Sequence, residues 1–576
     1  MKLFVEGYHY DISSEYSDIL RRFGGIPNAD KTISTEYVGY AYVKDVINDC
    51  VFILPKTIYD KNGNVFGLRP DDIIDVKNSK LNGNQKDFLH GLGVWIYRAL
   101  KRYGQSKEKT SVLLKKTFSQ VANGKPSSGT LLDVFLSLKN FYDANRDFFI
   151  FTMRNVHSQR HRIDWPRTIA NTSAFFQDDV PLYLNPIGRK RCIDWDEELM
   201  TIFFSVLNYM NSFGFNINID LNYDIIKGEK FKSYLSGLGI NRMRSIKHRY
   251  FSDKTKQIWT LCYAFFKKSE EISASRQDAE ILMATLFEKI FEEMVDALIG
   301  DPTLADKKTL NDNKIIDHIF TYRSLFSTES VYYIGDSKYY RDVSGPQRDS
   351  HSTFKQFSYA RNIVNNWILD NMRDAWPYRD NLTEGYVVIP NFFINARIND
   401  KLKYETDDIA CQDAQTSSYQ FRQFVNRLFD RDTLWVRQYN LNFLYLISVY
   451  ASGNKAEATR FKEKAYKFFR ERTIALLNEK YEFWRLTPKV KPIPDEVKWQ
   501  LRGMSYALKN GRLLLAIQKP DRSGDDCKIE NDVKLIAPII RANFEYQACA
   551  LSTNDSFIVI ENSDKRSFSF DLEDKD

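Results

Sequence analysis

The pattern of apolar and polar positions changes along the chain and predicts different kinds of structure in turn. Within the first 85 residues, short apolar segments such as 36–43 and 50–55 are bounded by turn-forming residues, which predicts a β-rich N-terminal domain. Over residues 86–275 apolar residues recur mostly at helical spacing, for example at 131–142, which predicts a mostly helical middle region.

Residues 276–480 combine both patterns. A single helix is expected over 279–300, because six apolar residues recur there at helical spacing: Met283, Phe287, Ile290, Phe291, Met294 and Leu298. The elements expected after it are strands near 318–322 and 331–340, a helix over 352–366 and a strand at 385–390. Short apolar segments after residue 480 predict a small β-containing extension over 481–576. The sequence therefore predicts an α+β multidomain protein with an α/β core.

Composition narrows the class of protein. The chain has 576 residues, of which 43% are hydrophobic and 27% charged, so sizeable buried cores are expected. The net charge of +7 allows a polyanionic partner without requiring one. The six cysteines form no CxxC pair, which disfavours structural zinc and fits a reducing compartment. Without a signal-like segment or an apolar run of transmembrane length, we expect a cytoplasmic protein with no membrane contact.

One stretch joins a predicted strand to charged residues suited to phosphate chemistry. Asp336 and Lys338 follow an apolar run and stand two residues apart, so their side chains share one face of the strand. Asp317 lies in a second short apolar run upstream. Two such carboxylates can hold Mg²⁺ together with water and phosphate oxygens, while Lys338 would orient the attacking water or offset phosphate charge. The structural alternative is an Asp336–Lys338 surface pair on an ordinary α/β sheet.

This pattern resembles the PD-(D/E)XK nucleases. In that superfamily the helix before the acidic strands often adds a glutamate to the metal site, and the helix after them often presents a Gln or Tyr. Glu288 and Gln356 occupy these places, and Tyr359 follows Gln356 by one turn. Glu288 is equally typical of an exposed acid on an amphipathic helix, and the structural alternative for Gln356 and Tyr359 is plain helix surface.

The resemblance implies a restriction-endonuclease-like α/β core and a set of site residues. The catalytic residues would be Asp317, Asp336, Lys338, Glu288 and Gln356. The ligands of Mg²⁺, or of Mn²⁺ in its place, would be Asp317, Asp336 and the backbone carbonyl of Ser337.

Four segments are also similar to a narrower group, the LlaJI-type restriction endonucleases, which are related to McrC, the nuclease subunit of McrBC-type systems. They are residues 163–168, 336–340, 426–434 and 439–446. The resemblance implies a Mg²⁺-dependent endodeoxyribonuclease that cleaves double-stranded DNA in anti-phage defence. It also implies a separate McrB-like AAA+ GTPase or ATPase hexamer as partner, since this chain has no Walker A pattern.

Two other functions remain open. The chain could regulate an NTPase partner and bind DNA with a vestigial nuclease fold, or it could be a DNA-binding scaffold without hydrolytic activity. Basic segments at 154–167, 240–250 and 454–477 could contact phosphates, with Trp165 as a stacking surface. Such runs are more often solvated faces.

Overall fold

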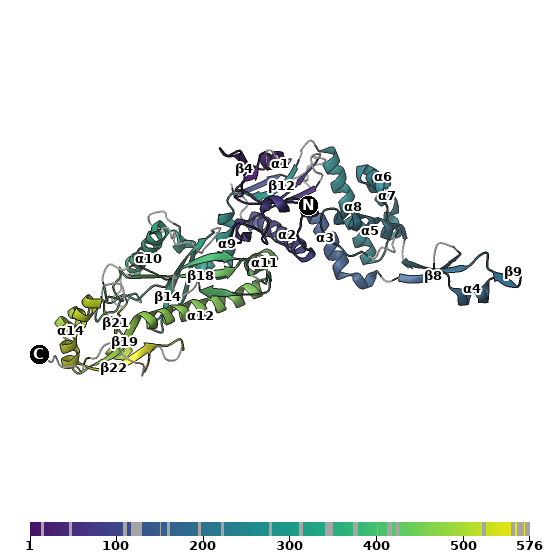
Figure 1. The fold of residues 1–576 in the computed structure, drawn as a ribbon. Coiled ribbons are helices and arrows are strands. Elements are labelled where there is room, and N and C mark those ends of the chain that lie inside the picture. The colour runs from purple at the N-terminus through teal and green to yellow at the C-terminus, as the bar shows by residue number, and fades with distance from the viewer. Residues whose placement is uncertain are drawn as a thin grey trace. The chain divides into compact units, whose positions relative to one another are not determined.

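The computed structural model divides the chain into two compact units, described separately below (Figure 1). The N-terminal unit comprises Met1–Leu54, Leu68–Tyr97 and Leu113–Thr285, and the C-terminal unit comprises Pro55–Gly67, Arg98–Val112 and Leu286–Asp576. The structure describes residues 1–12, 16–44, 49–60, 62–106, 112–116, 129–149, 151–157, 162–193, 197–219, 224–275, 279–309, 315–339, 350–371, 378–399, 401–411, 418–421, 425–520, 526–554, 559–561 and 570. The division into four domains stays a prediction.

The N-terminal unit is built on a five-stranded sheet with the order β1-β6-β5-β12-β7. Only the β1–β6 pair in this sheet is parallel. Its strands are β1 (Lys2–Val5), β5 (Val38–Val43), β6 (Asp49–Leu54), β7 (Leu113–Lys116) and β12 (Ala279–Ala284). A small second sheet contains β2 (Tyr10–Asp11), β3 (Ile26–Pro27) and β4 (Thr32–Ser34). The predicted strands at 36–43 and 50–55 are confirmed as β5 and β6.

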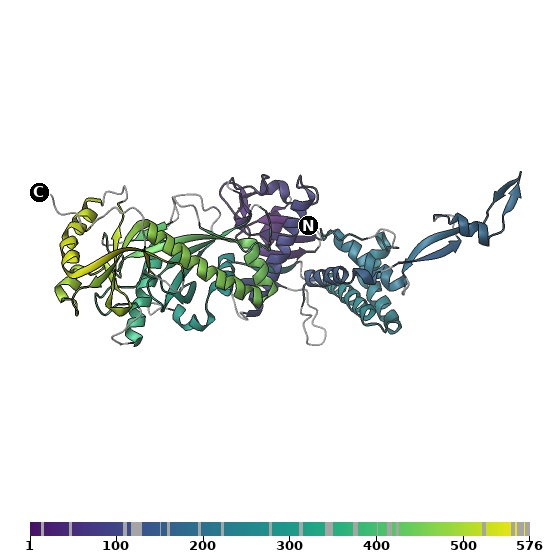
Figure 2. The same cartoon turned by 90° about the horizontal axis from the view of Figure 1, so that it is seen from below.

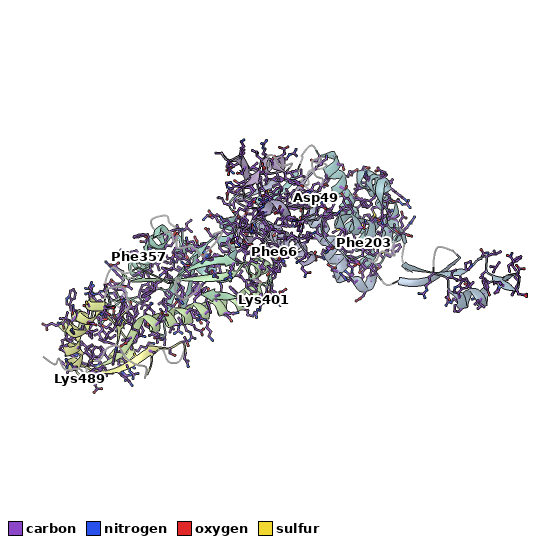
Figure 3. All side chains as sticks on the ribbon, viewed as in Figure 1. Asp49, Phe66, Phe203, Phe357, Lys401 and Lys489 are labelled. Carbon is purple, nitrogen blue, oxygen red and sulfur yellow. The ribbon has the colours of Figure 1, made fainter. Side chains whose placement is uncertain are left out.

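Helices form most of the remaining N-terminal unit. They are α1 (Ser17–Arg22), α2 (Gly83–Ser106, whose last residues belong to the C-terminal unit), α3 (Leu131–Ala144), α4 (Trp165–Asn171), α5 (Glu197–Asn211), α6 (Gly228–Ser233), α7 (Gly239–Ile246) and α8 (Asp253–Ala274). Two antiparallel strand pairs interrupt them, β8 (Phe151–His157) with β11 (Ile187–Ile193) and the hairpin of β9 (Phe175–Gln177) with β10 (Val180–Leu182). Phe203 of α5, labelled in Figure 3, is fully buried and stacks on Phe149 at 5.4 Å between ring centroids.

The C-terminal unit contains a central sheet with the order β13-β14-β15-β18-β16, and β17 also pairs with β18. Its strands are β13 (His318–Arg323), β14 (Ser330–Lys338), β15 (Asn391–Arg397), β16 (Ile409–Cys411), β17 (Ser418–Phe421) and β18 (Leu434–Asn442). β13 is antiparallel to β14, whereas β14, β15 and β18 run parallel. Parallel strands need long connections, and the connection between β14 and β15 contains a helix.

Helices cover both faces of this central sheet. They are α9 (Phe287–Ile299), α10 (Ser350–Asn371), α11 (Phe443–Ser452) and α12 (Lys455–Lys480). Tyr333 of β14 packs through Phe320 against Tyr466 of α12, whereas Asp336 of the same strand meets Lys355 of α10. Because positions 333 and 336 of a strand face opposite sides, α10 and α12 lie on opposite faces of the sheet (Figure 1).

A second sheet ends the C-terminal unit, with the order β20-β21-β19-β22-β23. Its elements are β19 (Tyr481–Pro488), α13 (Asp495–Gln500), β20 (Ser505–Ala507), β21 (Leu513–Gln518), α14 (Asp526–Asn543), β22 (Phe544–Leu551) and β23 (Val559–Glu561). Figure 2 shows its yellow strands next to the green α12, which leads directly into β19. Its core joins strand residues such as Leu486 and Leu515 to Ile529 and Ile540 of α14.

Two predicted elements differ from the structure. The single helix over 279–300 is wrong, because residues 279–284 form β12, which pairs with β5 on one side and β7 on the other, and α9 begins only at Phe287. The strand expected at 385–390 begins instead at Asn391, directly after Pro390, which has no N–H for a sheet. Among the helices that the structure describes, none is long and apolar enough to cross a membrane.

Candidate active site

The two aspartates predicted to bind metal come together at one end of the central sheet. Asp317 directly precedes β13, Asp336 lies near the end of β14, and these strands are antiparallel neighbours. The backbone N–H of Ser337 donates a hydrogen bond to Oδ2 of Asp317 at 3.0 Å. Burial, and then the charge of the neighbouring Asp336 carboxylate, raises the pKa of Asp317 to about 6. Asp336 is buried and Asp317 is half-buried, so two acids that repel one another form the centre of the site.

The sequence of β14 explains how the side chains of Asp336 and Lys338 come to lie at the end of the sheet. Val331 and Tyr333 fill the face toward α9 and α12, and the alternate positions carry Asp336 and Lys338 on the other face. Gly335 is required by close packing, since a Cβ at this position would overlap the ring of Phe392 on β15.

Two lysines contact the Asp336 carboxylate. The ammonium of Lys338 pairs with Oδ2 of Asp336 and lies 5.2 Å from the ring centroid of Phe393. Nζ of Lys355, on α10, lies 3.4 Å from Oδ1 of Asp336. Burial opposes the charge of Lys355, but the Asp336 carboxylate and the Tyr359 hydroxyl outweigh it, so the pKa of Lys355 is raised. The sequence analysis missed Lys355, whose only signal was its place next to Gln356.

The structure places a different glutamate of α9 near Asp317 than the one chosen from the resemblance. Glu288 is exposed in the first turn of α9. Glu292, one turn later, is partly buried, and its charge contributes to the raised pKa of Asp317. Its carboxylate pairs with Lys289 at 2.8 Å. Between these two glutamates of α9, Glu292 is therefore the one whose charge raises the pKa of Asp317.

Gln356 supports the sheet from beneath the site. Its side chain is 1% exposed, and its amide nitrogen donates to the carbonyl of Ile334 at 2.9 Å and to Oδ1 of Asn391 at 3.0 Å. The next residue, Phe357, is labelled on α10 in Figure 3. The hydroxyl of Tyr359 donates to the carbonyl of Ile315 at 2.8 Å. Both predicted residues of α10 thus hold β14 and the segment before β13 in place.

The donor set at the sheet end suits a hard divalent cation that keeps part of its water. Within the described ranges, no group of three or more acidic, histidine or cysteine side chains is placed to hold a metal. The protein would supply two carboxylates, Asp317 and Asp336, and the carbonyl of Ser337. Mg²⁺ is usually bound by few carboxylates together with water and phosphate oxygens, so these residues fit it.

The basic segments have different surroundings. On α12, Lys462 donates to the carbonyl of Gly300 at 2.5 Å, and Arg470 is buried and donates to the carbonyls of Ser324 and Thr553. These cations therefore hold the fold together. In segment 154–167, residues 158–161 lie outside the described residues, and Trp165 is 52% exposed.

Comparisons with known proteins gave one similarity. No family model matches the sequence, and no curated protein matches it. Among solved structures, the chain is similar to a refined half-complex from a tetradecameric assembly of Thermococcus gammatolerans McrB AAA+ hexamers with bound McrC. The identity is 13%, the match covers 81% of this chain and 99% of that chain, and the TM-score is 0.27.

Proposed function

We propose that this chain is a Mg²⁺-dependent endodeoxyribonuclease that hydrolyses DNA phosphodiester bonds through a PD-(D/E)XK-like core. The observation that supports it most is the pair of carboxylates of the half-buried Asp317 and the buried Asp336, with the Ser337 N–H on Asp317 and two lysine ammoniums on Asp336. Buried like charges are unfavourable without a cation between them, whereas a divalent cation makes the same arrangement favourable.

Each side chain has a role that follows from its place. Asp317, Asp336 and the carbonyl of Ser337 would hold the cation. Bound Mg²⁺ would polarise the scissile phosphate and lower the pKa of a water. The side chain of Lys338 is 14% exposed, so its ammonium reaches the edge of the site, where it offsets charge that develops on the phosphate. Lys355, with a side chain 38% exposed, would contact the same or the next phosphate.

We further propose that the nuclease is a subunit of a McrBC-like or LlaJI-like restriction system and works with a separate AAA+ NTPase. The support is the sequence resemblance at residues 163–168, 336–340, 426–434 and 439–446. The lack of a Walker A pattern in the chain means that the NTPase activity would come from another protein.

The test is cleavage of double-stranded DNA with Mg²⁺, with and without the candidate NTPase and nucleotide. Asp336→Asn and Lys338→Met are compared with Asp495→Asn, a control at an acid whose side chain is 96% exposed in the same unit. Cleavage that survives only in wild type and the control supports the proposal. Cleavage that persists in both site variants excludes this site. DNA binding without cleavage in any mixture favours a regulator or scaffold.

A further inference from the structure

Behind the proposed metal ligands, four segments of the C-terminal unit meet in one hydrogen-bonded network. Its members are Asp296 on α9, Lys308 at the end of the 3₁₀ helix Pro302–Lys308, His318 at the start of β13, and Ser337 on β14. His318 is fully buried, and Ser337 is 8% exposed. The proposed chemistry uses none of these side chains.

The carboxylate of Asp296 contacts two other members of the network. Its Oδ1 lies 2.5 Å from Nζ of Lys308 and 3.4 Å from Nδ1 of His318. Burial alone would raise the pKa of Asp296, but the hydrogen bond and charge of His318, together with Lys308, lower it. Asp296 is thus held as a carboxylate and can fix both partners at once.

Each partner of Asp296 reaches the backbone or side chain of a proposed ligand. Nζ of Lys308 donates to the backbone carbonyl of Asp317 at 2.9 Å. Nε2 of His318 lies 2.6 Å from Oγ of Ser337, whose own N–H donates to the Asp317 carboxylate. The contacts close a ring that runs from Asp296 through both ligand positions and back.

The direction of the Ser337 side chain decides whether this closed series of contacts can act on a substrate. Alternation along β14 turns Oγ of Ser337 away from Asp336 and Lys338, toward α9. A serine, a histidine and an aspartate that contact one another in this order also resemble a nucleophilic triad. A substrate could not reach this serine, because His318 is fully buried and the hydroxyl faces packed protein.

We infer that Asp296, Lys308 and His318 are positioning residues that fix the backbone of Asp317 and Ser337 for a divalent cation. This inference rests on the proposed function. Groups that orient metal ligands from behind usually change metal affinity or activity by about 10–100-fold when they are replaced.

The test measures Mn²⁺ binding to the full chain by electron paramagnetic resonance, without DNA or partner. The variants are Ser337→Ala, which removes one hydroxyl and keeps the backbone, His318→Gln and Asp296→Asn. The matched control is Tyr333→Phe, which removes a partly buried hydrogen bond to the carbonyl of Arg323 (3.0 Å) from the same face of β14. Thermal unfolding is followed for every variant.

We expect the three network variants to bind Mn²⁺ about tenfold more weakly, while Tyr333→Phe lowers thermal stability without changing Mn²⁺ affinity. Wild-type affinity in Ser337→Ala and in the folded variants of His318 or Asp296 would show that the network is only structural. If wild type binds Mn²⁺ in a way that depends on Asp336 but not on the network, this inference fails and the proposed function stands. If wild type binds no Mn²⁺, both fail.

Discussion

Each unit of the molecule contains an acid whose pKa is raised first by burial, and the surroundings of the two acids differ. In the N-terminal unit, Glu280 of β12 is fully buried, accepts a hydrogen bond from the N–H of Leu131 at 2.8 Å and pairs with Lys268 at 3.1 Å. Burial raises the pKa of Glu280 to about 7, and Lys268 opposes this rise. In the C-terminal unit, burial also raises the pKa of Asp317, but the next cause is repulsion from Asp336.

The difference separates a structural ion pair from a candidate site. Lys268 donates in addition to the carbonyl of Gly129 at 2.9 Å, so the Glu280 pair ties β12 and α8 to the start of α3. The contacts within the protein compensate both charges. At Asp317 and Asp336, two acids share one location. Lys338 and Lys355 pair with Asp336, but repulsion from Asp336 still raises the pKa of Asp317, and a divalent cation between the two carboxylates would offset that repulsion.

The largest effect is expected for Asp317→Asn. Removal of a proposed metal ligand should reduce cleavage by about a thousandfold, because a metal contributes several kcal/mol of charge stabilisation. The same change should stabilise the metal-free protein, since the raised pKa means that the ionised form is unfavourable in the folded state. A rise from 3.8 to about 6 sets an upper bound of about 3 kcal/mol above pH 6.

Both results are measured on the same preparations. Cleavage is assayed with Mg²⁺, and stability is taken from urea midpoints at pH 8 in a chelator. A variant that loses activity and is also less stable than wild type would mean that the Asp317 carboxylate is an ordinary structural acid.

The substitution Lys268→Met tests the structural ion pair between Lys268 and Glu280. The change leaves Glu280 buried without its main cation, and loss of one partner of a buried pair costs about 3–5 kcal/mol. Because Glu280 can take up a proton, the loss should be smaller at pH 6 than at pH 8. Hydrogen exchange of the β12 amides measures this loss of stability at both pH values. Lys232→Met, in an exposed pair with Glu229 at 2.7 Å, is the control and should change little.

The pH dependence of stability should show the Glu280 pair directly. The folded state holds the Glu280 proton up to a pH of about 7, whereas the unfolded state releases it near 4.5. The folded state therefore binds more protons between these values, and wild type should lose stability as pH rises through this window. Relative to wild type, Glu280→Gln should gain stability across the window, as measured by urea midpoints at half-unit steps. A constant difference from pH 4.5 to 7 would contradict the raised pKa.

The elements that local periodicity describes well were predicted correctly. The strands β5, β6 and β14 and the helices α3 and α10 follow from alternation or helical spacing within one segment. Strand β12 was predicted wrongly as part of a helix. Its apolar run also fits a helix, and its pairing with β5 depends on residues far away in the chain. The sequence pattern identified Asp317 and Asp336 as a pair, and the structure brings them together.

The rest of the site depends on packing between distant segments. Lys355 reaches Asp336 only because α10 packs on one particular face of β14, and helical periodicity does not specify that face. For the same reason the sequence pattern does not predict the contact between Asp296 and His318, which come from two elements and meet only in the folded unit. Their catalytic or positioning roles stay predictions.

The smallest effect concerns the glutamate of α9. Glu292→Gln should raise the Mg²⁺ concentration for half-maximal cleavage about threefold to tenfold, because Glu292 adds negative charge at Asp317 from partly buried surroundings. Glu288→Gln should change it less than twofold, since an exposed charge is screened by solvent.

The two glutamates make a matched pair, since they lie one turn apart on one helix and the same substitution removes one charge from each. Added salt should reduce any effect of Glu288→Gln but leave most of the effect of Glu292→Gln, because screening acts mainly on exposed charges. A larger effect at Glu288 would restore the residue that the resemblance indicates, and would mean that α9 turns toward the aspartates when the cation binds. Equal and small effects at both positions would leave Asp317 and Asp336 as the only acids that hold the metal.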